Sequence, residues 1–298
     1  MLGLGFLGAL VACSPGVQPD SIVFQMDWTH EAEFVGFYAA EAQGFFRDAG
    51  LTVTLVEGPA GTDVPGILTS GKADAAQMGA VMFQAASQAS PDLVAVMAVL
   101  QTSPRVLMTR VDQGVHHPRD LEGLRVGVKS GSWAGLVKKI MVNAGADPSK
   151  IIQVPVKNTE VERFYRGEVD VWTGFATSEP VDAELAAHPV NLLYADDYGA
   201  GGYDELVVLR RSELEKNKDK WRRFAQALVK GWTWAGAHTD AVIGLLDTVQ
   251  PQASHRFHTL AWKALRPLVI TGKDPVGWIQ NVRWSLHGPF AMDLLESP

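Results

Sequence analysis

The chain has 298 residues, of which 47% are hydrophobic and 20% are charged, and its formal net charge is −7. This length exceeds what one compact core usually needs and suits two lobes of ordinary domain size. The acidic balance offers no basic excess to attract phosphates, so the composition argues against a protein that binds DNA or RNA. A single cysteine excludes an internal disulfide framework and a cysteine-rich metal site.

The N-terminal residues join an apolar run to that cysteine. Residues 1–13 read MLGLGFLGALVAC, which resembles a bacterial lipoprotein signal peptide with its lipobox. Cleavage there would make Cys13 the lipidated first residue, and residues 14–20 would form a flexible tether. No Lys or Arg precedes the apolar run, and a buried N-terminal helix is the alternative interpretation. Because no later apolar run reaches the ~20 residues of a membrane span, we expect an anchored, not an embedded, protein.

Short apolar runs then alternate with helical patterns through the first two-thirds of the chain. One helix is expected to run to Ala49, and the first strands are predicted at residues 21–26, 51–56, 74–79 and 93–100. The series restarts after Pro104, with strands at residues 106–110, 124–128, 151–156, 169–175 and 190–195. The alternation indicates an α/β fold with largely parallel sheets, and the restart indicates a second lobe.

The last third has a different pattern, with one strand at residues 205–210 and almost only helices after it. Because it lacks strands for a sheet of its own, we expect it to pack on the first lobe. The predicted lobe 1 comprises residues 21–103 and 204–298, lobe 2 comprises residues 104–203, and the two crossings form a hinge. In such a protein the ligand cleft lies between the sheets, at the carboxyl ends of their strands.

Motifs that suggest catalysis or metal binding lack their structural context. Residues 3–8 match G-x-G-x-x-G but lie in the leader, and residues 66–73 end in Ala73 where a phosphate-binding loop needs a hydroxyl group. The histidine pairs at residues 116–117 and 255–258 lack metal-ligand spacing. No G-x-S-x-G elbow is present. We therefore expect a protein that is not an enzyme and has no cofactor or metal.

The predicted strand ends supply the candidate ligand-binding residues. Aromatic side chains beside Gly, Ser and Thr suit a planar ligand that is held between rings and hydrogen-bonded at its edge. An anionic ligand would want Arg or Lys, and only Lys129 is close. The candidates before the first crossing are Asp27, Trp28, Glu33, Phe34, Tyr38, Gly61, Thr62, Met78 and Gln101. Those after it are Ser130, Ser132, Trp133, Thr173, Phe175, Glu179, Asp197, Tyr198 and Tyr203.

Each candidate also has an ordinary structural interpretation. Trp28 could be a core residue at the sheet edge, the serines could cap a helix, and the carboxylates could be solvated. Phe34, Phe37, Tyr38 and Phe45 recur at the spacing of a helix core face. We assign Phe37 and Phe45 to the core, whereas Phe34 and Tyr38 lie nearer the helix start and stay candidate contacts.

Four segments carry a resemblance to a known family: residues 27–61, 70–79, 169–185 and 194–206. They resemble the thiamine-precursor-synthesis-like family of ABC-transporter solute-binding proteins. This group belongs with nitrate, sulfonate and taurine receptors and includes receptors for thiamine-pyrimidine precursors and for riboflavin. The resemblance implies a type II periplasmic-binding-protein fold that closes by a hinge on its ligand. It also implies delivery of that ligand to a membrane permease driven by an ATPase.

The segment after the first strand bears on the ligand. Pyrimidine-type members resemble D-W-x-P-N-x-x-H-x-G, whereas this chain has residues 33–36, Glu-Phe-Val-Gly, where Asn and His chemistry is expected. The A-E-F-x-G-F-Y form at residues 32–38 is similar to riboflavin-type receptors. The resemblance thus implies a monomeric, extracytoplasmic receptor, lipid-anchored or periplasmic. Its expected ligand is an aromatic heterocycle, riboflavin first and a thiamine-type pyrimidine second. A pyrimidine-synthesis enzyme on the same fold and a sulfonate or nitrate receptor are the alternatives.

Overall fold

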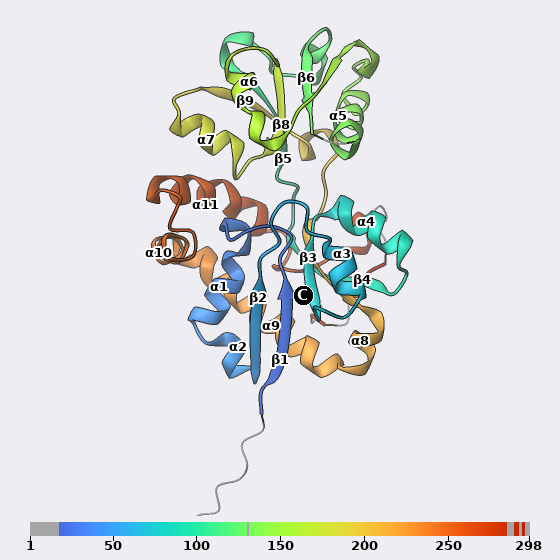
Figure 1. Ribbon diagram of the computed structural model, residues 1–298, viewed down its shortest axis with the longest axis vertical. Helices are drawn as coiled ribbons and strands as arrows, with labels where there is room; N and C mark the ends of the chain where they lie inside the picture. The colour runs from blue at the N-terminus through green and yellow to red at the C-terminus, as the bar shows by residue number, and fades with distance from the viewer. Residues whose placement is uncertain (1–17, 130, 285–288, 292–293, 296–298) are drawn as a thin grey trace, which may run out of the picture.

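Two lobes lie one above the other in the computed structural model of the protein, and two chain crossings connect them (Figure 1). The structure describes residues 18–129, 131–284, 289–291 and 294–295. The predicted leader with Cys13, the first part of the predicted tether and Ser130 lie outside the described residues. Each lobe is built on a five-stranded sheet. The predicted α/β fold is therefore confirmed.

The sheet of lobe 1 has the strand order β2-β1-β3-β10-β4. Strand β10, which follows the second crossing, lies between β3 and β4 and is antiparallel to both. Strand β4 is buried at every position, which explains its uninterrupted apolar sequence. The strands are β1 (Asp20–Gln25), β2 (Leu51–Val56), β3 (Ala75–Met78), β4 (Leu93–Leu100) and β10 (Asp204–Arg210).

Helices cover both faces of this sheet (Figure 1). The long helix α9 packs against α1, so the last third of the chain completes lobe 1. The early helices are η1 (Ala32–Phe34), α1 (Val35–Ala42), α2 (Phe45–Asp48), α3 (Val64–Thr69) and α4 (Ala80–Ala89). The late helices are α8 (Arg211–Lys216), α9 (Lys218–Ala237), α10 (Thr239–Val249), α11 (His255–Val269) and α12 (Asn281–Trp284).

The sheet of lobe 2 has the strand order β7-β6-β8-β5-β9. Its strands are β5 (Arg105–Arg110), β6 (Arg125–Val128), β7 (Ile152–Pro155), β8 (Val171–Phe175) and β9 (Val190–Tyr194). Its helices include η3 (Pro118–Leu121), α5 (Gly131–Asn143), η4 (Pro148–Lys150), α6 (Glu162–Tyr165), α7 (Glu179–Leu185) and η6 (Asp196–Tyr198).

The expectation of largely parallel sheets is confirmed, with one antiparallel strand in each sheet. Four strands run in the same direction in each lobe: β2, β1, β3 and β4 in lobe 1, and β7, β6, β8 and β9 in lobe 2. The strands that leave the two crossings, β5 and β10, each run antiparallel to both of their neighbours. A strand that returns from the other lobe enters the sheet at the edge where the parallel strands end, so it must run in the opposite direction.

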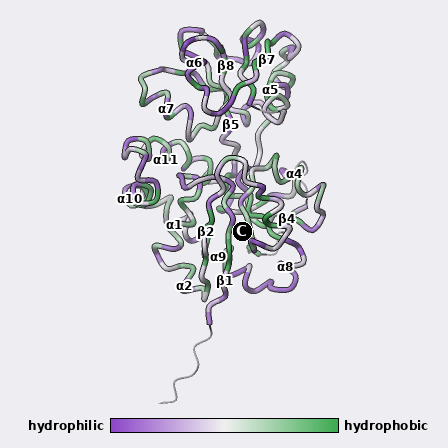
Figure 2. The backbone as a smooth tube through the Cα atoms, viewed as in Figure 1, coloured by the Kyte–Doolittle hydropathy of each residue, from purple (hydrophilic) through white to green (hydrophobic). Residues whose placement is uncertain are grey.

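The aromatic residues after β1 form a core against α9. Phe24 lies 4.5 Å from Phe37 between ring centroids, and Phe46 stacks on Phe224 of α9 at 5.7 Å. The single helix expected up to Ala49 is divided between α1 and α2, because Gly44 adopts a left-handed φ of 74°. Figure 2 shows how polarity is distributed in lobe 1: residues of β1 are largely hydrophobic, whereas those of α8 are largely hydrophilic. Among the described residues, no helix combines the length and apolar character that a membrane crossing requires.

Candidate functional site

Five carboxyl groups meet where lobe 1 faces lobe 2, and we call them the carboxylate cluster: Asp27, Glu31, Glu33, Asp204 and Glu205. They come from the chain after β1, from η1 and its approach, and from the start of β10. Because β10 is antiparallel to β3, its first residues lie at the edge where the parallel strands β1 and β3 end. The sheet topology thus brings together carboxyl groups that are far apart in sequence.

Burial and mutual repulsion raise the pKa of three members of this cluster, Asp27, Glu31 and Glu205. Burial raises the pKa of Asp27 to about 7, and the charges of Glu33 and Asp204 add to the effect. Burial also raises the pKa of Glu31 well above its usual range, with Glu33 as the strongest neighbouring charge. The pKa of Glu205 is likewise raised by burial and then by the charge of Asp27. The unliganded cluster therefore resists full ionisation at neutral pH.

Backbone and amide groups hold three of the carboxylates in place. Gly79 donates its backbone N–H to Oδ2 of Asp27 at 3.1 Å, and Ala80 donates its own to Oδ1 of Asp204 at 2.6 Å. The amide Nε2 of Gln77 donates to Oε2 of Glu205 at 2.8 Å. Glu205 has a left-handed φ of 49°, a conformation that a non-glycine residue keeps only where its surroundings enforce it.

Arg105, the first residue of β5, links the cluster to lobe 2. Its Nε lies 3.1 Å from Oδ2 of Asp204, and both side chains are almost wholly buried. The same guanidinium lies over two rings of lobe 2, 5.3 Å from the Trp133 centroid and 5.5 Å from the Phe175 centroid. The ion pair therefore joins the first strand after one crossing to the first strand after the other.

An aromatic pair forms the lobe 2 side of the interface between the lobes. Trp133, in the first turn of α5, meets Phe175, at the end of β8, edge to face with centroids 5.7 Å apart. Glu179 at the start of α7 accepts a hydrogen bond from the Phe175 backbone N–H at 2.9 Å. Glu179 also pairs with Lys129, whose ammonium group lies 5.6 Å from the Trp133 centroid.

A direct hydrogen bond between buried side chains connects the two lobes. Thr177 of lobe 2 donates its hydroxyl to Oε1 of Glu33 at 2.7 Å, and these side chains are 5% and 8% exposed. Helix α7 also lies against α11 of lobe 1 (Figure 1). The carboxylate cluster and the aromatic pair thus face each other within one interface between the lobes.

Comparison with known proteins assigns the chain to a family. The model of the NMT1/THI5-like family matches residues 31–242. The chain belongs to the NMT1/THI5-like family. It is 25% identical to the formylaminopyrimidine-binding protein of Halalkalibacterium halodurans, over 94% of this chain and 87% of that protein. It is 21% identical to a 4-amino-5-hydroxymethyl-2-methylpyrimidine phosphate synthase of Saccharomyces cerevisiae, over 71% of this chain and 66% of that one.

The fold of this NMT1/THI5-like protein also matches solved structures. The periplasmic aliphatic sulphonate binding protein SsuA of Escherichia coli superposes with a TM-score of 0.73 at 18% identity, over 90% of this chain and 84% of that one. The predicted periplasmic-binding-protein fold is therefore confirmed. The resemblance to solute-binding proteins of ABC transporters, stated from the sequence alone, is confirmed as well.

Six of the residues predicted from the sequence lie at this interface or beside it: Asp27, Trp28, Glu33, Trp133, Phe175 and Glu179. Trp28 follows Asp27 directly and keeps 37% of its surface exposed, unlike a core residue. Ser132 is exposed at the start of α5, one residue before Trp133. The search at the predicted strand ends therefore identified residues of both lobes at this interface.

Three other predicted contacts are engaged within lobe 1 in this structure, and their part in ligand binding stays a prediction. Phe34 is 1% exposed and packs with Phe37 in the core of lobe 1, and Met78 belongs to the core beneath α4. Tyr38 pairs its hydroxyl with Nδ1 of His30 at 2.8 Å. Phe34 and Met78 therefore lie in the cores of lobe 1, whereas Tyr38 also lies next to Glu31 of the carboxylate cluster.

Three more side chains are engaged by the backbone. Thr173 donates its hydroxyl to the Gly127 carbonyl at 3.1 Å. Gln101 donates its amide to the Ala98 carbonyl at 2.9 Å, and the Tyr203 hydroxyl accepts the Gln280 N–H at 2.8 Å. These contacts hold strand ends and the crossings in place.

Four predicted residues lie away from the cluster. The Tyr198 carbonyl accepts a hydrogen bond from Asn143 at the far end of α5, roughly 18 Å along that helix from its first turn. Asp197 beside it is exposed. Gly61 and Thr62 belong to an exposed turn, in which the Thr62 hydroxyl bonds to the Pro59 carbonyl.

Sequence reasoning missed six residues of the interface: Glu31, Gln77, Arg105, Thr177, Asp204 and Glu205. One signal was available, because Asp204 and Glu205 open a strand whose next four residues are apolar. Charged residues at that position must find partners when the strand is buried. Arg105 is the first residue of β5, directly after the first crossing, as Asp204 is the first residue of β10 after the second. The two crossings run side by side, so an ion pair between Arg105 and Asp204 could have been proposed from the topology.

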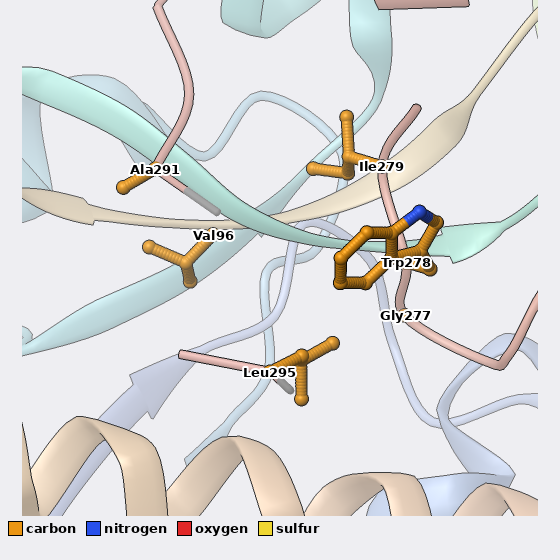
Figure 3. A pocket seen from close by; sticks show the side chains of 6 residues that line it. All are labelled: Val96, Gly277, Trp278, Ile279, Ala291 and Leu295. Atoms are coloured by element: carbon orange, nitrogen blue, oxygen red, sulfur yellow. The ribbon is translucent and has the colours of Figure 1, made fainter. Parts of the chain in front are cut away.

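Two hollows elsewhere do not belong to this interface. A small cavity of about 10 Å³, enough for one water molecule, lies beside β4 and is lined by Val96, Gly277, Trp278, Ile279, Ala291 and Leu295 (Figure 3). A groove of about 400 Å³ lies on lobe 2 between α5 and the segment from Asp147 to Gln153. Neither is lined by a member of the carboxylate cluster.

Proposed function

We propose that this protein is the receptor of an ABC importer and binds an aminopyrimidine of the formylaminopyrimidine type by closing its lobes. The observation that carries this proposal is the pairing of hydrogen-bond acceptors with aromatic rings across one interlobe interface. An aminopyrimidine offers amino N–H groups to carboxylates and a flat face to rings. The relative that matches along almost the full chain is named for such a ligand.

The charge of the interface argues against the sulfonate or nitrate alternative. An anion at this position would be repelled by the carboxylate cluster, in which Arg105 is already paired with Asp204. Lys129, the cation nearest the aromatic pair, is likewise paired with Glu179. The likeness to a sulphonate-binding protein therefore supports the fold and not the ligand.

The structure favours a different ligand from the one that the sequence alone suggests. Residues 32–38 suggest riboflavin, but Phe34 of that segment packs in the core and the Tyr38 hydroxyl pairs with His30. The segment therefore supplies no open aromatic slot for a flavin. We place the pyrimidine first and keep riboflavin as the second candidate.

The cellular setting of the receptor follows from the proposed transport role. We propose that Cys13 carries the lipid anchor, that the protein acts outside the cytoplasm as a monomer, and that a permease and its ATPase receive the ligand. Residues 14–20 would then separate the lobes from the membrane. Mass spectrometry of membrane-extracted protein tests the anchor by the added mass on an N-terminal Cys13.

The ligand is tested by titration of tryptophan fluorescence with formylaminopyrimidine, riboflavin and an alkanesulfonate. We expect saturable quenching with the pyrimidine alone. Tight binding of riboflavin without the pyrimidine would instead restore the flavin assignment. The synthase alternative, suggested by the yeast relative, is tested in the same samples: pyrimidine phosphate formed by the protein would show an enzyme.

A further inference from the structure

The carboxylate cluster holds more acceptors than its neighbours can satisfy. Within the part of the chain that the structure describes, its five carboxyl groups have one cationic partner, Arg105, which bonds to Asp204. The other described donors that reach the cluster are neutral. They include the Gln77 amide, the Thr177 hydroxyl and the backbone N–H groups of Gly79, Ala80 and Glu205. Glu31 and Glu33 also share a side-chain hydrogen bond, which uses a proton of the cluster itself. With every carboxyl ionised, the cluster and Arg105 together would carry a charge of −4, from five negative groups and one positive group.

A second, independent observation shows a missing donor at the same place. Gln77 has no exposed surface, and its amide end lies at the cluster because Nε2 donates to Glu205. The other atom of that amide, Oε1, is buried without a hydrogen-bond partner. A buried carbonyl oxygen without a donor is costly, so an acceptor left open beside carboxylates points to a donor that arrives with a ligand.

Arg105 shows which chemistry this interface accommodates. Its planar guanidinium bonds to a carboxylate on one side and lies over Trp133 and Phe175 on the other. A flat cation with several N–H groups therefore already satisfies both the carboxylates and the rings. The four remaining members of the cluster have no cationic partner among the described residues: Asp27, Glu31, Glu33 and Glu205.

We propose that the carboxylate cluster selects a ligand that is cationic when bound, namely a small planar heteroaromatic base with a protonated, amidine-like N–C–N edge. This inference rests on the proposed function and narrows it, because an aminopyrimidine can adopt that form by taking up one proton. The protonated edge donates to the carboxylates and to Oε1 of Gln77, while the ring meets the aromatic pair. A neutral planar ligand of the same shape leaves the buried acceptors unsatisfied.

The pH dependence of this binding follows from the groups that act on the cluster. They are its own five carboxyls from the chain after β1, from η1 and its approach and from β10, together with Tyr38 of α1 and Arg105 of β5. Protons held by the carboxyls in the unliganded protein compete with a cationic ligand. A cation of fixed charge should therefore bind more tightly as the pH rises from about 5 to about 8.

A matched pair of probes tests the proposal on the full chain. Benzamidine is a planar cation throughout this pH range, and benzamide is its neutral counterpart of nearly the same shape. We expect benzamidine to bind at least about tenfold more tightly than benzamide at pH 8 by calorimetry, with a smaller ratio at pH 5. Equal binding of both probes, or binding of neither, would overturn the proposal.

Variants of the carboxylate cluster test whether the preference for benzamidine arises there. Glu205→Gln and Glu31→Gln should each reduce the preference for benzamidine several-fold, whereas Glu184→Gln, an exposed position on α7, should leave it unchanged. Circular dichroism checks that each variant folds, and the two cluster variants make the test independent of either one alone. A preference that survives in both folded variants would place the cation elsewhere. Calcium that stabilises the protein and displaces benzamidine would show a metal site instead of an organic one.

The outcome is separable from that of the proposed function. If formylaminopyrimidine binds but benzamidine has no advantage over benzamide, the receptor assignment stands and the cationic form of the ligand is wrong. If benzamidine is preferred but formylaminopyrimidine does not bind, the cationic site stands and the pyrimidine assignment is wrong.

Discussion

Arg105 stabilises the interface between the lobes. Its guanidinium pairs with Asp204 of lobe 1 and lies over the rings of Trp133 and Phe175 in lobe 2. Removing one partner of a buried ion pair leaves the other charge uncompensated, which costs about 3–5 kcal/mol. We therefore expect Arg105→Ala to lower the free energy of unfolding by about 3 kcal/mol in denaturant titrations. The matched control is Arg222→Ala, at an exposed position of α9, which should change it by less than about 0.5 kcal/mol. Similar losses in both variants would contradict a special role for Arg105.

Asp27 gives the unliganded protein a pH-dependent stability. Its pKa is raised from 3.8 to about 7 in the folded state, so between these values the folded protein binds more protons than the unfolded chain. Stability from this group is therefore present at low pH and is lost as the pH rises toward 7. We expect the melting temperature to fall between about pH 4 and pH 7, and the fall to be smaller in Asp27→Asn. Identical pH profiles for the two proteins would show that other groups cause the effect.

Trp28 is the residue whose exposure separates binding from packing. Because 37% of its surface is open, truncation should remove a ligand contact without opening a core cavity. We expect Trp28→Ala to weaken formylaminopyrimidine binding about tenfold or more while changing the unliganded melting temperature little. Trp262→Ala, fully buried in lobe 1, is the contrasting variant and should destabilise the protein by about 3–5 kcal/mol. A large loss of unliganded stability in Trp28→Ala would make it a core residue.

The pairing of α1 with α9 depends on two glycines that let the helices approach closely. A Cβ atom at Gly36 would lie 2.3 Å from the Trp232 ring, and one at Gly231 would lie 2.2 Å from the Gly36 carbonyl oxygen. The sequence predicted both helices, but nothing in it showed that these positions would touch. The packing partner, not the helix propensity, decides which residue is tolerated there.

Opposite effects of the same substitution test this packing. Gly36→Ala should destabilise the protein by at least about 1–3 kcal/mol, because the added methyl group overlaps the Trp232 ring. Gly244→Ala in α10, where a Cβ would meet nothing within 4 Å, should stabilise it by about 1 kcal/mol through helix propensity. Thermal unfolding of both variants is the measurement, and shifts of the same sign would refute the close approach.

The hydrogen bond between Thr177 and Glu33 is one of the contacts that connect the two lobes. It joins buried side chains of the two lobes at 2.7 Å. Thr177→Val keeps the shape but removes the donor, so a closed molecule would bury Glu33 without that partner. We expect a shift toward separated lobes, seen as a larger radius of gyration in X-ray scattering, and about tenfold weaker ligand binding.

The control for this shift is Thr52→Val, at an exposed position of the edge strand β2. It makes the same chemical change away from the interface and should alter neither the scattering nor the affinity. An unchanged radius of gyration and affinity in Thr177→Val would show that other contacts, such as α7 against α11, hold the lobes closed.

The sequence by itself determined the alternation of strands and helices, because hydrophobic periodicity is a local property that each segment shows without its partners. It also indicated a second lobe and the return of the last third, since a helical segment with a single strand needs a sheet elsewhere. At the cleft it found Asp27, Glu33, Trp133, Phe175 and Glu179, because strand ends are recognisable one at a time.

Only the tertiary structure decided which of these residues meet. Asp204 and Glu205 join Asp27 because β10 enters lobe 1 beside β3, a pairing between segments more than 120 residues apart that no local pattern encodes. Packing within each lobe likewise buries Phe34 against Phe37 in lobe 1 and places Tyr198 at the far end of α5 in lobe 2. The raised pKa of Asp27 exists only in the folded protein, because burial and neighbouring charge act through space and not along the chain.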